Sequence, residues 1–143
     1  MTQTTISTKV QKLVADFAAL STWEEKYARI IEMGKALPPL EESLRTDQNK
    51  VRGCQSQVWL SARAEGGKIY FSADSDATIV KGLIALILHV YSGHTPGEIL
   101  SQKPDFIQDI GLNTNLSQAR SNGLVSMIKQ IMFYALAFQT IAE

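Results

Sequence analysis

Apolar side chains recur along the chain with two different periods, and these periods predict its secondary structure. Residues 7–19 and 22–33 carry apolar side chains at helical spacing, and Thr22 offers an N-cap for the second helix. The segment Ile79–Tyr91 is apolar nearly all round, which predicts a helix in the core. Gly82 within it should cost about 1 kcal/mol relative to alanine unless close packing requires a glycine.

A period of two follows the loop of residues 37–50 and predicts a β-hairpin. Apolar and polar residues alternate over Val58–Ala64, and Ile69–Ala73 is a second strand-like run. Glu65–Lys68, with two glycines at its centre, separates the runs and predicts a tight hairpin turn. We expect Lys50–Gly53 to add a third antiparallel strand, with helices covering one face of the sheet.

The remaining elements are predicted from capping residues. Asp74, Ser75 and Asp76 offer side-chain oxygens before the core helix. Thr95 and the proline after it begin a short helix, another short helix covers 104–110, and a long apolar stripe after Ser117 predicts the last helix. The fold class is therefore α+β, with a small three-stranded antiparallel sheet packed against helices.

Composition favours one domain, over residues 1–143, in a reducing cytoplasm. Fourteen basic and fourteen acidic residues balance, so neither nucleic acid nor a membrane is expected as a partner. One cysteine excludes an intrachain disulfide, and with two histidines it provides too few ligands for a zinc or iron–sulfur site. The N-terminus lacks the pattern of a secretory signal, and the longest apolar run is too short to cross a bilayer.

The lone cysteine, Cys54, lies between Gly53 and Gln55 just before the first strand. The thiolate is the reactive form of cysteine, and the positive charges of Lys50 and Arg52 favour it. Cys54 is therefore a candidate sulfur nucleophile. The alternative is an inert side chain in the interior, because free cysteine is often buried as a small hydrophobe.

The two histidines bear on a rival chemistry. A cysteine hydrolase or transferase would need a base such as His89 or His94 near the thiol, and separations of 35 or 40 residues neither permit nor forbid this. We expect His89 to be a hydrogen-bonded histidine in the core or at its edge. We expect His94, which follows Gly93 in a turn, to be solvated.

Four stretches together resemble the SufE family of sulfur-acceptor proteins, which includes the CsdE-like members. The likeness covers most of the chain and is weaker in the first few residues and over 101–115. The glutamine, serine and glutamine after the cysteine are nearer to the SufE branch than to the CsdE branch. The matching stretches are Trp23–Tyr27, Gly53–Trp59, Asp74–Leu83 and Arg120–Leu124.

The resemblance implies an α+β fold similar to the IscU scaffold and a role as a sulfur carrier. Cys54 would accept persulfide sulfur from a pyridoxal-phosphate cysteine desulfurase of the SufS or CsdA type and stimulate that enzyme. It would then pass the sulfur to an iron–sulfur assembly scaffold of the SufB type. The chain itself would need no cofactor or metal, whether it counts as an enzyme stays undecided, and a homodimer is left open.

The resemblance also suggests supporting residues around Cys54. Arg120 would stabilise the persulfide anion or fix the docking pose, or else form an ion pair with Asp74, Asp76 or a neighbouring loop. Asp76 would hold the cysteine loop or only cap the helix. Gly53, Gln55 and Gln57 would shape the loop. The second rival function is a regulatory subunit that stimulates the desulfurase by binding alone.

Overall fold

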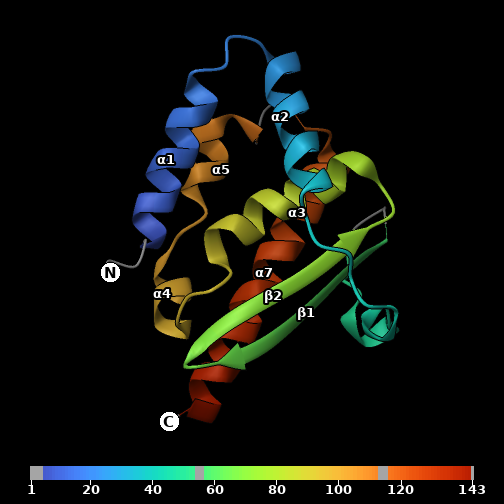
Figure 1. Cartoon of the computed structure of the whole chain (residues 1–143), viewed down its shortest axis with the longest axis vertical. Helices are drawn as coiled ribbons and strands as arrows, with labels where there is room; N and C mark the ends of the chain where they lie inside the picture. Colours follow the sequence, from blue (N-terminus) through green and yellow to red (C-terminus); the bar gives the residue numbers. More distant parts are fainter. Residues whose placement is uncertain (1–4, 54–56, 113–115, 143) are drawn as a thin grey trace.

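The computed structural model describes residues 5–53, 57–112 and 116–142, and its elements follow the sequence pattern closely (Figure 1). Two antiparallel strands form a hairpin, helices pack on one another and on the sheet, and a long C-terminal helix runs behind the hairpin. The expected α+β class is confirmed. The helices and strands are α1 (Ile6–Ala18), α2 (Trp23–Lys35), β1 (Val58–Glu65), β2 (Lys68–Ser75), α3 (Thr78–Tyr91), α4 (Pro96–Ser101), α5 (Asp105–Ile110) and α7 (Gln118–Ala142).

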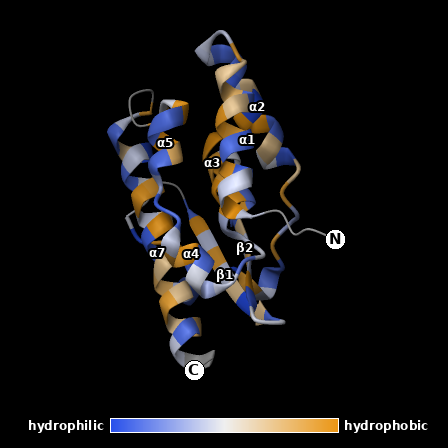
Figure 2. Cartoon of the chain, turned by 90° about the vertical axis from the view of Figure 1, so that its left-hand side faces the viewer, coloured by the Kyte–Doolittle hydropathy of each residue, from blue (hydrophilic) through white to orange (hydrophobic). Residues whose placement is uncertain are grey.

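Helix α3 is the centre of the core. Nine of its fourteen residues are buried, and the part of its ribbon that is visible behind α1 in Figure 2 is coloured mainly as hydrophobic. It crosses α2 where Gly34 faces Gly82, and a Cβ on Gly82 would lie 2.3 Å from the backbone oxygen of Ile30. The glycine in α3 is therefore required by close helix packing, which is the one circumstance expected to justify its cost.

The hairpin is regular over its whole length. Val58 pairs with Ser75 and Glu65 pairs with Lys68, with every residue between them in register. Gly66 and Gly67 both have positive φ, at 60° and 79°, which only glycine adopts readily and which matches the twist of a two-residue hairpin turn.

The expected third strand is wrong for the described residues, where the sheet has two strands. Lys50 forms one isolated antiparallel bridge with Trp59, and the backbone N–H of Val51 donates to the Val58 oxygen at 2.9 Å. The chain then turns at Gly53, whose φ is 91°. Pairing therefore stops after a single step.

The segment from residue 37 to 50 is the expected surface loop, but it is not without structure. It contains two short 3-10 turns, η1 (Glu42–Leu44) and η2 (Asp47–Asn49). The side-chain amide of Asn49 donates to the Leu44 oxygen at 2.8 Å and joins the two turns. The loop therefore reaches the sheet as an ordered arm.

The capping oxygens expected before α3 are used differently. Asp74 and Ser75 belong to β2, and the N-cap of α3 is Ala77, whose side chain makes no capping bond. Ser75 Oγ accepts from the Ala77 N–H at 3.2 Å. The carboxylates of Asp74 and Asp76 bind other segments, as described below.

Candidate functional site

The described residues on either side of Cys54 define the site. Cys54 and Gln55 lie outside the described residues, whereas Gly53 and Gln57 lie within them. The chain approaches the cysteine through the ordered arm of residues 37–50 and the turn at Gly53, and after the cysteine it continues directly into β1. Both sides are attached to the hairpin, so a segment of only three residues, 54–56, connects two fixed points.

Gly53 fixes the entry side against the last helix. A Cβ at this position would lie 2.6 Å from Oγ of Ser126 on α7, a separation that real Cβ atoms do not show. Its φ of 91° also disfavours any other residue. Glycine is therefore favoured here by the turn, and a larger residue would also require the Ser126 hydroxyl to move.

Asp76 fixes the exit side. Its Oδ1 accepts a hydrogen bond from the backbone N–H of Gln57 at 3.0 Å, and its own N–H donates to the Gln57 oxygen at 3.3 Å. In a regular antiparallel pair a backbone carbonyl would accept this hydrogen bond, and here the Asp76 carboxylate accepts it instead. The contact lies one residue beyond the pair of Val58 and Ser75. Asp76 thus contacts the cysteine loop and does not cap α3.

A cavity of about 270 Å³ lies at the start of β1, between β1, α3 and α7. Val58, the first residue of β1, contributes to its wall. The rest of the lining is mostly apolar, with Ser117 and Arg120 as its polar side chains; the other lining residues are Val80, Leu83, Ile84, Ile87, Ala119, Gly123, Leu124 and Met127. The cavity can therefore shelter an uncharged or weakly solvated group beside one cation.

Arg120 is exposed in the first turn of α7, where its backbone N–H donates to Oγ of Ser117 at 3.3 Å. Its side chain forms no ion pair with any residue that the structure describes, so the alternative of a salt bridge to Asp74 or Asp76 is wrong for the described conformation. Its guanidinium is available for an external anion.

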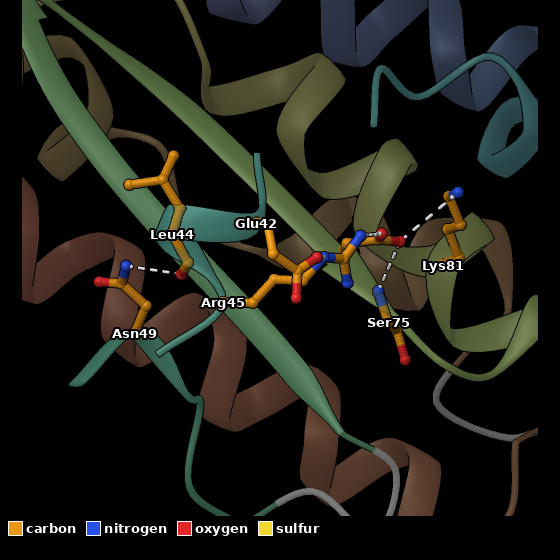
Figure 3. Close-up of polar contacts among 7 residues, drawn as sticks. Glu42, Leu44, Arg45, Asn49, Ser75 and Lys81 are labelled. Carbon is orange, nitrogen blue, oxygen red and sulfur yellow. Dashed lines mark hydrogen bonds and ion pairs between the residues drawn. The ribbon is translucent and has the colours of Figure 1, made fainter. Parts of the chain in front are cut away.

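The buried carboxylate of Asp74 is the most densely contacted charge near the loop. Arg45 from the ordered arm donates to its Oδ2, and Lys81 of α3 lies 3.4 Å from its Oδ1 (Figure 3). Burial alone would raise the pKa of Asp74, but the hydrogen bonds from Arg45 and the Ser75 N–H, with the charge of Lys81, outweigh burial and lower it. Asp74 is therefore ionised and holds two cations from different segments.

The sequence pattern did not single out Arg45, which links the arm to the hairpin in two ways. Besides binding Asp74, its guanidinium carbon lies 5.1 Å from the ring centroid of Trp59. Trp59 and Asp74 are direct partners in the hairpin register. The sequence did not predict this contact, because residues 37–50 have no helical or strand periodicity from which the direction of the Arg45 side chain could be inferred.

Both histidines lie away from the described ends of the loop. His94 is buried, which makes the expected solvated position wrong, and it bridges to Ile69 near the hairpin turn. The distance along β1 from Val58 to Ala64, which pairs with Ile69, is about 20 Å at the usual rise of a strand. His89 is exposed on the face of α3 that lies opposite the cavity-lining residues.

The described residues offer no other obvious chemistry. No group of three or more histidine, cysteine, aspartate or glutamate side chains gathers there as a metal site would require. None of the described helices has the length and apolarity to cross a membrane.

Fold and site define a class: an α+β domain in which the described residues on both sides of a single cysteine are tied to a two-stranded hairpin, and the first residue of that hairpin lines an apolar cavity. Comparison with known proteins gives the family. The profile of the SufE family, described as an Fe-S metabolism associated domain, matches residues 11–135. The chain belongs to the SufE family, and this confirms the resemblance seen in the sequence.

Similar proteins cover nearly the whole chain. An uncharacterized SufE-like protein of Rhizobium etli is 46% identical over 85% of this chain and 86% of its own. Another, of Rhizobium meliloti, is 44% identical over 87% of this chain and 92% of its own. One from Synechocystis is 38% identical over 97% of this chain and 87% of its own. The solution structure of a hypothetical protein from Thermus thermophilus aligns over 92% of this chain and 96% of its own, with a TM-score of 0.78 at 22% identity, which supports the fold.

Proposed function

We propose that the protein is a sulfur carrier in iron–sulfur metabolism and that Cys54 receives the sulfur. The donor is the persulfide of a pyridoxal-phosphate cysteine desulfurase of the SufS or CsdA type, which the protein also stimulates. The acceptor is an iron–sulfur assembly scaffold of the SufB type. The observation that carries the proposal is the attachment of both sides of the Cys54 segment, through Val51 to Val58 and through Gln57 to Asp76.

The transfer needs only thiol chemistry. The Cys54 thiolate attacks the terminal sulfur of the enzyme persulfide, a new sulfur–sulfur bond forms on Cys54, and the enzyme thiolate leaves. The sulfane sulfur keeps its oxidation state, so no external oxidant or reductant takes part. Positioning of the thiol therefore matters more than acid–base machinery, which suits a site whose described residues include no nearby histidine.

The surroundings suit a carrier of a reactive intermediate. A persulfide that is exposed to water reacts with oxidants and stray thiols. The apolar cavity beside Val58 offers a resting place for Cys54, and Arg120 at its edge offers a positive charge for the persulfide anion or for docking. A carrier also fits the single cysteine better than a scaffold does, because a cluster needs several thiolates.

The direct test is mass spectrometry of the intact protein after incubation with a cysteine desulfurase and cysteine. We expect one added sulfur atom that a reductant removes and that Cys54→Ser prevents. Cys54→Ser should also abolish the stimulation while docking to the desulfurase persists. Stimulation that survives in Cys54→Ser would instead support a regulatory subunit that acts by binding.

The hydrolase alternative is tested with the histidines. His89→Gln combined with His94→Gln should leave sulfur acceptance unchanged, because neither side chain lies at the described ends of the loop. A cysteine hydrolase would lose its general base in the same variant.

A further inference from the structure

The ion pair between Arg45 and Asp74 lies on the entry side of the cysteine loop. Residue 45 belongs to the arm, and residue 74 is the penultimate residue of β2. Nothing in the chemistry of sulfur transfer requires a buried carboxylate at this point. The contact therefore needs an explanation of its own.

The end of β2 holds both sides of the loop with two acidic residues. Asp74 binds the entry side through Arg45, and Asp76 binds the exit side through the backbone of Gln57. The two carboxylates are two positions apart in sequence and bind different segments. The end of β2 thus contributes to the attachment of both sides, together with the hydrogen bond from Val51 to Val58 on the entry side.

The contacts on Arg45 resist displacement more than an exposed ion pair would. Its side chain is about three-quarters buried, and Asp74 is 6% exposed. Lys81 shares the carboxylate, so the carboxylate links the arm, the hairpin and the start of α3 (Figure 3). The guanidinium also lies on the Trp59 ring, which favours arginine over lysine at this position.

We propose that Arg45 and Asp74 are positioning residues that hold the arm on the hairpin and thereby set the reactivity of Cys54. This rests on the proposed function for its biological meaning but not for its measurement. Loss of the tether weakens the attachment of the entry side, which the hydrogen bond from Val51 to Val58 then holds with less support. The thiol should therefore meet small reagents more often and be presented to a desulfurase less accurately.

The hairpin supplies a matched control. The guanidinium carbon of Arg63 lies 4.9 Å from the Tyr70 ring centroid, and its guanidinium pairs with Glu65. Arg63 thus makes a ring contact and an ion pair, as Arg45 does, but near the other end of the hairpin. Arg63→Met therefore removes an arginine, a ring contact and an ion pair without touching the arm. Because the Arg63 pair is exposed and the Arg45 pair is buried, urea unfolding of Arg45→Met separates a general loss of stability from an effect on the arm.

The experiment measures alkylation of Cys54 by iodoacetamide in the folded protein across a range of pH. Arg45→Met and Asp74→Asn should each raise the rate about tenfold, the factor expected when a local opening loses one charge-assisted hydrogen bond. Arg45→Lys should lie between these and the native protein, and Arg63→Met should match the native protein. Urea unfolding confirms that each variant is folded, and Asp74→Asn serves as the test if Arg45→Met does not fold.

A second measurement follows sulfur transfer from a desulfurase. Arg45→Met and Asp74→Asn should lower kcat/KM for transfer about tenfold, with Arg63→Met unchanged. The proposal would be overturned if folded Arg45→Met and Asp74→Asn were alkylated no faster than Arg63→Met. If the native protein accepts no sulfur while the alkylation rates change as expected, the proposed function fails and the positioning role stands.

Discussion

Asp76 accepts the backbone N–H of Gln57 at 3.0 Å and so closes the exit side of the cysteine loop onto the end of β2. The same residue returns its own N–H to the Gln57 oxygen. One aspartate therefore continues the sheet by one step where the backbone has already turned toward α3. A side chain at this point controls how the loop joins a rigid element.

Replacement of Asp76 should loosen that junction. Asp76→Ala removes the acceptor for the Gln57 N–H and should lower the free energy of unfolding by about 1 kcal/mol, the usual net value of one hydrogen bond. It should also raise the rate of Cys54 alkylation. Asp76→Asn keeps an oxygen in place and should remain close to the native protein in urea unfolding and in thiol labelling. Equal behaviour of the two variants would show that the hydrogen bond does not hold the loop.

The crossing of α2 and α3 makes Gly82 intolerant of a methyl group. Gly82→Ala would place Cβ 2.3 Å from the Ile30 oxygen, so the helices must separate. We expect a loss of about 2 kcal/mol in the free energy of unfolding, because overpacking outweighs the better helix propensity of alanine. Gly97→Ala in α4, with nothing within 4 Å, is the control and should be neutral or slightly stabilising in the same urea titration. Equal stabilities of the two variants would contradict this account.

The elements of the fold could be predicted because the signals for them are local. The helical stripe of α1, the Thr22 cap of α2 and the glycine turn of the hairpin each depend on a few neighbouring residues. Even the cost at Gly82 was visible in the sequence, although its reason was not. Ile30, which lies 52 positions earlier, supplies that reason, because its backbone oxygen would lie 2.3 Å from a Cβ on Gly82.

The parts that could not be predicted depend on contacts between distant segments. Arg45 and Asp74 are 29 residues apart, and nothing in the loop sequence indicates which carboxylate the arginine meets. The capping prediction for Asp74 failed for the same reason, since its local role lost to a buried ion pair. His94 was expected in a solvated turn, but α4 and the hairpin bury it.

Gly53 combines a backbone requirement with a packing requirement, and variants can separate the two. Gly53→Ala should be destabilising both through its φ of 91° and through contact with Ser126 Oγ. Gly66→Ala, with φ of 60° and open space, carries only the conformational cost, about 1 kcal/mol. Gly53→Ala should therefore cost about 1 kcal/mol more than Gly66→Ala in urea unfolding.

Ser126→Ala provides the rescue. It removes Oγ and leaves the Ser126 Cβ position 3.6 Å from the new methyl group, an ordinary contact. Gly53→Ala should therefore cost less in the Ser126→Ala background than in the native protein, and the cost that remains is that of alanine at a φ of 91°. A double variant no more stable than Gly53→Ala would place the whole effect in the backbone.

His94 makes the stability of the fold depend on pH near neutrality. Its Nδ1 lies 3.4 Å from Oε2 of Glu98, and its Nε2 is buried without a hydrogen-bond partner among the described residues. Burial, with the charge of Lys9, lowers the pKa of His94 despite the neighbouring carboxylate. His89 is exposed at the surface, but partial desolvation by its neighbours, together with the charges of Lys9, Lys12 and Arg29, lowers its pKa as well.

The unfolded chain thus binds protons on both histidines before the folded chain does. Stability should be full above about pH 6.5, the ordinary histidine pKa, and should decrease as the pH falls through the lower folded values. Urea unfolding between about pH 7.5 and about pH 5.5 measures the slope, in a range above the usual carboxylate values. His94→Gln and His89→Gln should each reduce the slope of unfolding free energy against pH. The double variant should show almost no slope, since the chain has only two histidines. A His94→Gln slope equal to that of the native protein would show that the buried imidazole titrates normally in the folded state.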